Sequence, residues 1–169
     1  MTTLGALLLN PPLLGGARTV GQLHVVAELL KCDNVEIANL FAIGTRDITA
    51  INEVGQTITG WAAARSRLCE VIAASDQLLA GWGVSGLAGA AAQNQRAQLD
   101  YVRNCAEDIG KDYIWTLNGE PRHPSRWHQY VSDRHGRAVG ATSGERIAMV
   151  LTSVPIAALV RRAAAAKRR

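Results

Sequence analysis

The sequence predicts a three-layer α/β/α domain built around a central, mostly parallel sheet of four strands. Four short apolar runs of β-type composition, each closely followed by Gly, Pro or Asn, are the expected strands: residues 6–9, 35–42, 77–80 and 113–117. Helical patterns lie between these runs, and strands that alternate with helices form a parallel sheet. The length of 169 residues and the hydrophobic content of 48% suit a single core.

The expected helices follow in chain order. Residues 19–30 carry apolar side chains at helical spacing, and residues 59–74 repeat the pattern. A longer helix is expected over residues 87–109, with Gly110 as its C-terminal stop. A last helix is expected to begin near Ser143, to be broken or kinked at Pro155, and to end in a basic tail. We therefore expect residues 1–140 to form the α/β domain, and residues 141–169 to pack on it as a C-terminal helix and tail.

Charge and cysteine content restrict the class of protein. The net charge is +4, and much of the basic excess lies in Arg161, Arg162, Lys167, Arg168 and Arg169. Such a tail attracts phosphates, or it complements a helix C-terminus and stays solvated, and the sequence leaves both readings open.

The three cysteines are far apart and odd in number, and they lack C-x-x-C spacing. We therefore expect buried thiols in a reducing compartment, with neither a disulfide nor a zinc site. The apolar run 147–160 is short and contains Pro155, so no membrane span is expected; residues 4–9 lack the preceding basic residues of a secretion signal. These features favour a cytoplasmic protein.

Polar residues follow the expected strands, at the sheet edge where ligands bind in such folds. Asn10 follows the first strand, Asn39 lies in the second and His123 follows the fourth. An Asn in a β run is costly unless hydrogen-bonded, so Asn39 is either satisfied internally or points at a ligand. Pro121 and Pro124 stiffen the chain around His123, which makes a rigid surface loop or a preorganised charged site.

Other motifs point to no further chemistry. Residues 81–86 match G-x-G-x-x-G, but the chain lacks the second half of a dinucleotide-binding sheet. The serine-hydrolase elbow fails because Leu87 stands where its last glycine is needed. His128 and His135 have no Cys or acidic partner at metal-ligand spacing, so we expect no metal and no cofactor.

Four motifs taken together resemble a family of bacterial and phage domains of unknown function. They are residues 7–11 (LLLNP), 39–42 (NLFA), 80–83 (AGWG) and 119–124 (GEPRHP), and the resemblance covers roughly residues 5–128. That family in turn looks like a distant branch of the uracil-DNA glycosylase superfamily. Members of this superfamily have a four-stranded parallel sheet between helices.

The resemblance implies roles for individual residues. Asn10, with Pro11 beside it, would position the attacking water, and His123 would stabilise the departing base. Asn39 would read the edge of a flipped base. The other residues expected around the base are Pro11, Trp82, Gly83 and Arg122. The residues expected to contact DNA are Ser125, Arg126, Trp127, Lys167 and Arg168. Trp127 would insert into DNA or stack on a base, or else it is an exposed loop aromatic packed on the C-terminal helix.

The first motif departs from the uracil-specific branch, because neither a carboxylate nor a bulky Tyr follows Asn10. Without that Tyr, the side of the pocket facing C5 of a pyrimidine is expected to be open. The resemblance thus implies a DNA glycosylase for a modified pyrimidine, including bulky modified bases of phage DNA, in a setting such as phage defence. DNA is the expected partner of a monomer with no obligate protein partner and no membrane. The alternatives are a non-catalytic DNA- or nucleotide-binding module, and an enzyme acting on free nucleotides.

Overall fold

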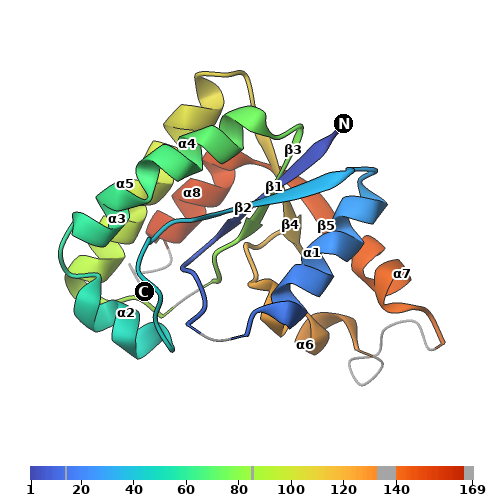
Figure 1. Cartoon of the computed structure of the whole chain (residues 1–169), viewed down its shortest axis with the longest axis horizontal. Coiled ribbons are helices and arrows are strands. Elements are labelled where there is room, and N and C mark those ends of the chain that lie inside the picture. The colour runs from blue at the N-terminus through green and yellow to red at the C-terminus, as the bar shows by residue number, and fades with distance from the viewer. Residues whose placement is uncertain (14, 85, 133–139, 166–169) are drawn as a thin grey trace.

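The computed structural model describes residues 1–13, 15–84, 86–132 and 140–165. Its centre is a five-stranded sheet in the order β2-β1-β3-β4-β5 (Figure 1). The strands are β1 (Thr3–Leu8), β2 (Asn34–Asn39), β3 (Gln77–Gly81), β4 (Tyr113–Leu117) and β5 (Leu151–Pro155). The first four are parallel, and β5 pairs antiparallel with β4. The expectation of an α/β domain with a mostly parallel sheet is confirmed at this level.

Helices cover both faces of the sheet (Figure 1). One face carries α2 (Ile48–Val54), α3 (Thr59–Ala63), α4 (Arg65–Ala74), α5 (Gly89–Glu107) and α8 (Ile156–Ala165). The other face carries α1 (Ala17–Leu29), the 3-10 turn η1 (Pro124–Arg126), α6 (His128–Val131) and α7 (Ser143–Ala148). The two hydrophobic clusters lie on opposite sides of the sheet, which makes three layers.

The central strand β1 explains why the first apolar run is nearly continuous. Every residue of β1 is buried, because parallel strands in the middle of such a sheet are covered on both faces. Leu7 joins the cluster under α4 and α5, whereas Leu4 and Leu8 join the cluster under α1. At Gly5 a Cβ atom would lie 2.3 Å from Ser75 Oγ, so the strand needs a glycine where α4 ends against it.

Three regions differ from the sequence-based expectation. The helix expected over residues 59–74 is divided at Ala64 into α3 and α4. The helix expected to run through Pro155 is instead α7, then β5, then α8. Pro155 ends an edge strand, a position where the missing N–H of proline is tolerated. The helix α2 was not expected, and it begins at Asp47, whose carboxylate accepts a hydrogen bond from Ala50 N at 3.0 Å. That contact is a standard N-terminal helix cap.

The cysteine expectation was wrong in one respect. Cys69 of α4 and Cys105 of α5 are joined by a disulfide, with their Cα atoms 6.0 Å apart, and only Cys32 is a free thiol. Helix packing brings together two cysteines that are distant in sequence, which their spacing could not reveal. Among the described residues, no helix is both long enough and apolar enough to cross a membrane.

Candidate functional site

The candidate site lies at the carboxyl edge of the parallel strands. Leu8 at the end of β1 is level with Asn39 in β2 and with Gly81 in β3. Neighbouring strands are about 4.8 Å apart, so the ends of these three strands lie within roughly 10 Å of one another. The fold therefore gathers the residues that follow separate apolar runs in the sequence.

The amide of Asn10 is held in one orientation. Its Nδ2 donates hydrogen bonds to Pro11 O at 3.1 Å and to Thr45 Oγ1 at 3.0 Å. A backbone carbonyl only accepts, so the group facing Pro11 O must be the NH2 group. The Asn10 Oδ1 atom accepts no hydrogen bond from any residue that the structure describes. The side chain therefore offers an acceptor at the end of β1.

Asn39 is the last residue of β2, and its Oδ1 atom is buried without a hydrogen-bond partner. The sequence left open whether this side chain is satisfied internally or points at a ligand. No described residue donates a hydrogen bond to this oxygen, so the first of the two readings does not hold for it. A buried unpaired acceptor is costly, and such atoms often mark the place of a ligand or an ordered water.

A tight turn directs the chain after β4 back towards the sheet. Asn118 and Gly119 both have positive φ angles, 57° and 76°, and Leu117 and Glu120 exchange backbone hydrogen bonds across the turn. Positive φ at both central positions is what Asn-Gly pairs adopt in hairpin turns. The sequence thus specifies the reversal that leads into the His123 segment.

The same segment is also attached to the end of β3. Gly83 N donates to Pro121 O at 2.6 Å. Pro124 packs over Gly81, where an added Cβ would lie 3.1 Å from Pro124 Cδ. The short chain between these two prolines, which carries His123, is therefore held at both ends against β3.

The contacts of His123 favour a ring with its proton on Nε2. Its Nδ1 accepts a hydrogen bond from Ser125 N at 3.3 Å and lies 2.8 Å from Ser125 Oγ. Burial, followed by the positive charge of Arg126, lowers the pKa of His123 below its usual value near 6.5. With Nδ1 accepting, the ring offers one donor, the Nε2–H group.

Most of the contacts of Arg122 hold the loop in place. Its guanidinium forms an ion pair with Glu120 at 2.5 Å and stacks 3.8 Å above the ring of Tyr130. Its carbonyl accepts the indole N–H of Trp127 at 2.8 Å. The Nε atom is buried without a partner, so this donor remains for the base contact that the sequence predicted.

Two predicted contact residues are core residues. Trp127 is 0% exposed and packs among Leu23, Val131 and Ile147, so the expectation that it inserts into DNA is corrected. Its cluster includes Ile147 of α7, so Trp127 packs on the first part of the segment expected as the C-terminal helix, whereas α8 lies on the other face of the sheet. Trp82 is 3% exposed in the opposite core cluster, which leaves the Gly83 backbone at the edge.

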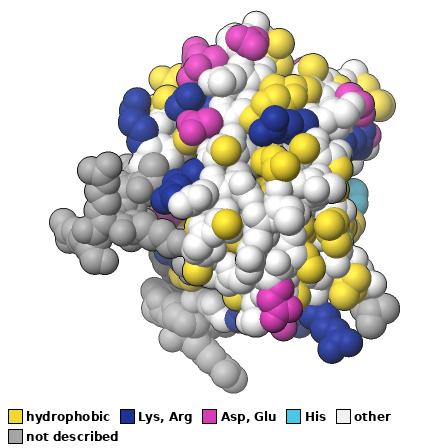
Figure 2. Space-filling view, turned by 90° about the vertical axis from the view of Figure 1, so that its left-hand side faces the viewer, with side chains coloured by type: hydrophobic (Ala, Val, Ile, Leu, Met, Phe, Trp, Pro, Cys, Tyr) yellow, Lys and Arg dark blue, Asp and Glu magenta, His cyan; other side chains and the backbone are white. Residues whose placement is uncertain are grey.

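The other predicted DNA contacts have different positions. Arg126 is exposed beside the loop, and Ser125 is half-buried because its Oγ and N–H face His123. Lys167 and Arg168 lie outside the described residues. Figure 2 shows the side of the molecule that carries α2, α3 and α5, where basic, acidic and hydrophobic side chains are interspersed. No single sign of charge dominates that face.

Thr45 is a site residue that the sequence analysis missed. It lies in the loop after β2, accepts the Asn10 hydrogen bond, and donates to Asp47 O at 3.4 Å. Nothing in the sequence links residues 10 and 45. The only local signal near Thr45 is Asp47, a residue type that favours the start of a helix. Among the described residues, no group of three or more His, Cys, Asp or Glu side chains is arranged to hold a metal ion.

A family model matches residues 7–125 of the chain. The family is described as protein of unknown function (DUF1643). The matched span begins in β1 and ends in η1, so it contains Asn10, Asn39, Thr45 and His123. No curated protein and no solved structure matches the chain.

Proposed function

Because the chain belongs to the DUF1643 family, whose description assigns no activity, we propose a function from its own site. We propose that the protein is a DNA glycosylase with a fold like that of uracil-DNA glycosylases. It hydrolyses the N-glycosidic bond of a flipped, modified pyrimidine and leaves an abasic site. The observation that carries the proposal is the buried, unpaired Oδ1 of Asn39 at the same sheet edge as His123, whose Nδ1 accepts a hydrogen bond from Ser125 N.

The proposed reaction breaks the bond between C1′ of the sugar and the base nitrogen. Its electron pair passes to the base, while an oxygen of water forms the new bond to C1′, and the proton released by the water ends on the base or in solvent. Positive charge thus develops on the sugar and negative charge on the base. A fixed donor beside the base stabilises that charge, and the Nε2–H of His123 is such a donor.

Asn10 would orient the water without acting as a strong base. Its free Oδ1 accepts a hydrogen bond from water, and its NH2 group is fixed by Pro11 and Thr45. A preoriented acceptor places the water in line with the breaking bond, and positioning of this kind lowers a barrier without proton transfer.

Asn39 would read the pairing edge of the flipped base. An amide offers a carbonyl acceptor and an NH2 donor, which complement either a uracil-like or a cytosine-like edge. A base donor placed on Asn39 Oδ1 would satisfy the buried acceptor. The flipped base would thereby restore a hydrogen bond that the free protein lacks.

A modified pyrimidine is the favoured substrate because the loop after Asn10 contains residues such as Pro12 and Leu13, and neither the carboxylate nor the Tyr of the uracil-specific branch. Phage genomes that carry bulky modified bases are then the natural substrates, and phage defence is the proposed setting.

The test is a base-release assay on duplex DNA that contains uracil, a thymine mismatch, 5-hydroxymethylcytosine or its glucosylated form, followed by alkaline cleavage. We expect release from at least one modified base. Asn10→Ala and His123→Ala should each abolish release with unchanged circular dichroism. The matched controls are His24→Ala and Asn104→Ala, which alter exposed side chains on α1 and α5 and should retain full activity. Undiminished release by both site variants would refute the assigned roles.

A non-catalytic DNA-binding module of the same fold is the second candidate, and one observation favours it. The hydrogen bonds of Asn10 reach a carbonyl and a hydroxyl, and no carboxylate is bonded to it among the described residues. DNA binding that weakens steeply with salt, without any abasic product from the same substrates, would favour this candidate over the enzyme.

A further inference from the structure

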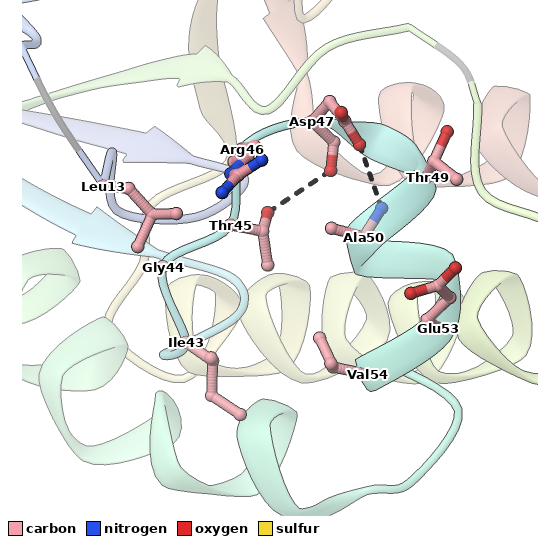
Figure 3. A pocket seen from close by; sticks show the side chains of 10 residues that line it. All are labelled: Leu13, Ile43, Gly44, Thr45, Arg46, Asp47, Thr49, Ala50, Glu53 and Val54. Carbon is pink, nitrogen blue, oxygen red and sulfur yellow. Dashed lines mark hydrogen bonds between the residues drawn. The ribbon is translucent and has the colours of Figure 1, made fainter.

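A groove lies beside the Asn10 loop, between the chain that follows β2 and the helix α2 (Figure 3). Its volume of about 460 Å³ is within the range of small-molecule sites, roughly 300–1,000 Å³. We call it the α2 groove. It is lined by Leu13, Ile43, Gly44, Thr45, Arg46, Asp47, Thr49, Ala50, Glu53 and Val54.

The α2 groove shares a wall with the candidate site. Thr45 lines the groove, and its Oγ1 accepts the hydrogen bond from Asn10 Nδ2. Pro12 pairs with Thr45 in an isolated parallel bridge, and Leu13 lies over Gly44, where a Cβ would be 3.1 Å from Leu13 Cδ2. The groove therefore adjoins the candidate site, with Thr45 between Asn10 and the groove.

The charges of the groove select a neutral ligand. Asp47 and Glu53 line it together with a single cation, Arg46. The cap hydrogen bond to Ala50 N holds the Asp47 carboxylate in place, as Figure 3 shows. Two carboxylates repel a phosphate, and the guanidinium repels an ammonium group. A hydroxyl suits both signs, because it donates to a carboxylate and accepts from a guanidinium.

The apolar part of the lining restricts the ligand further. Leu13 and Ile43 are exposed apolar side chains on the two loops, and Val54 is another at the end of α2. Figure 3 shows Leu13 on the opposite side of the opening from Ala50, whose small side chain leaves the middle of the groove open. The lining thus combines aliphatic contact surface with hydrogen-bonding groups of both kinds.

We propose that the α2 groove binds a neutral substituent of the target base that is larger than a hydroxymethyl group and carries several hydroxyls, such as a glycosyl group. The inference rests on the proposed glycosylase function and narrows its substrate class. The base lies at Asn39 and His123, and its substituent passes Thr45 and lies between Leu13 and Ala50. Selectivity for a modified base then comes from a surface separate from the groups that act on the glycosidic bond.

The test compares 5-hydroxymethylcytosine with and without an attached glucosyl group in otherwise identical duplexes, for binding by fluorescence anisotropy and for base release. Ala50→Phe fills the groove, and Glu53→Gln removes one hydrogen-bonding charge. Ala97→Phe and Glu28→Gln make the same changes at exposed positions of α5 and α1 and serve as controls. We expect Ala50→Phe to weaken binding of the glucosylated duplex by at least about tenfold, and to leave the other duplex and both controls within about twofold.

The outcomes separate this inference from the proposed function. If Ala50→Phe loses binding of the glucosylated duplex but the native protein releases no base, the proposed role of the groove is supported and the glycosylase function is refuted. If the native protein releases the base, and Ala50→Phe leaves this release unchanged or lowers it equally for both duplexes, the proposed role of the groove is refuted and the glycosylase function is retained. Equal affinity of the native protein for the two duplexes also overturns the groove.

Discussion

Replacing Trp127 tests whether this side chain stabilises the hydrophobic core or contacts DNA. The indole is 0% exposed, lies in the cluster under α1, and donates to Arg122 O at 2.8 Å. Trp127→Ala removes a large buried side chain and should lower the free energy of unfolding by about 3–5 kcal/mol. Trp127→Phe keeps most of the packing but leaves the Arg122 carbonyl unpaired, which should cost about 1–3 kcal/mol.

Urea denaturation followed by circular dichroism measures these losses. Trp115→Phe is the matched control, because the indole of Trp115 donates to Gln77 Oε1 at an exposed position and water can replace that bond. The control should lose about 1 kcal/mol or less. The reasoning is refuted if Trp127→Phe is as stable as the native protein while DNA binding is lost, since that pattern belongs to an exposed contact residue. If Trp127→Ala fails to fold, the Phe variant still decides.

Three further predictions follow from other contacts. Thr45→Val removes the acceptor of Asn10 Nδ2 and should lower kcat of base release by about tenfold to a hundredfold, with little change in KM. Thr45→Ser keeps the hydroxyl and should keep kcat near that of the native protein. Equal losses of kcat in both variants would contradict a positioning role. Gly60→Ala places a Cβ 2.3 Å from a ring carbon of Phe41 and should lower the free energy of unfolding by about 1–3 kcal/mol. Gly21→Ala in α1 has nothing within 4 Å of its new Cβ and should raise the free energy of unfolding by about 0.5–1 kcal/mol. Thermal unfolding measures both changes. Because the folded-state pKa of His123 is lowered, the unfolded chain binds the extra proton; the stabilisation from neutral His123 is complete above about pH 6.5 and is lost as the pH falls towards the folded-state pKa. Urea midpoints between pH 7.5 and 5 should therefore fall more for the native protein than for His123→Gln, and parallel curves would count against a neutral buried ring.

Local patterns predicted most of the fold. The four parallel strands were found as short apolar runs, which are most continuous in the central strand β1 because it is covered on both faces, whereas β2 is a half-buried edge strand. The long helix was found because its apolar residues recur with helical period. The strand β5 was missed because its residues lie within the apolar run 147–160, where strand and helix cannot be told apart by hydrophobicity. The short helix α2 has a clear cap at Asp47 but few residues in which a period could be detected.

The candidate site was predictable only in part. Strand ends indicated Asn10, Asn39 and His123, since the carboxyl ends of parallel strands meet at one edge. The Thr45 contact depends on how two loops approach each other, which no local pattern reports. The burial of Trp127 depends on α1 and α7 covering the turn after His123, so a residue that resembles a surface contact in sequence becomes part of the core.

The antiparallel pairing of β5 affects how the chain can fold as it is synthesised. Leu117 pairs with Leu151, about 34 residues later, so β4 leaves the ribosome well before its partner. At roughly 5–20 residues per second, that delay is on the order of 2–7 s. During this interval one edge of β4 has no neighbouring strand, and an unpaired edge is a template for pairing with other chains. The nascent protein is therefore most prone to aggregate after the residues of the site have been made and before the sheet that supports them is complete.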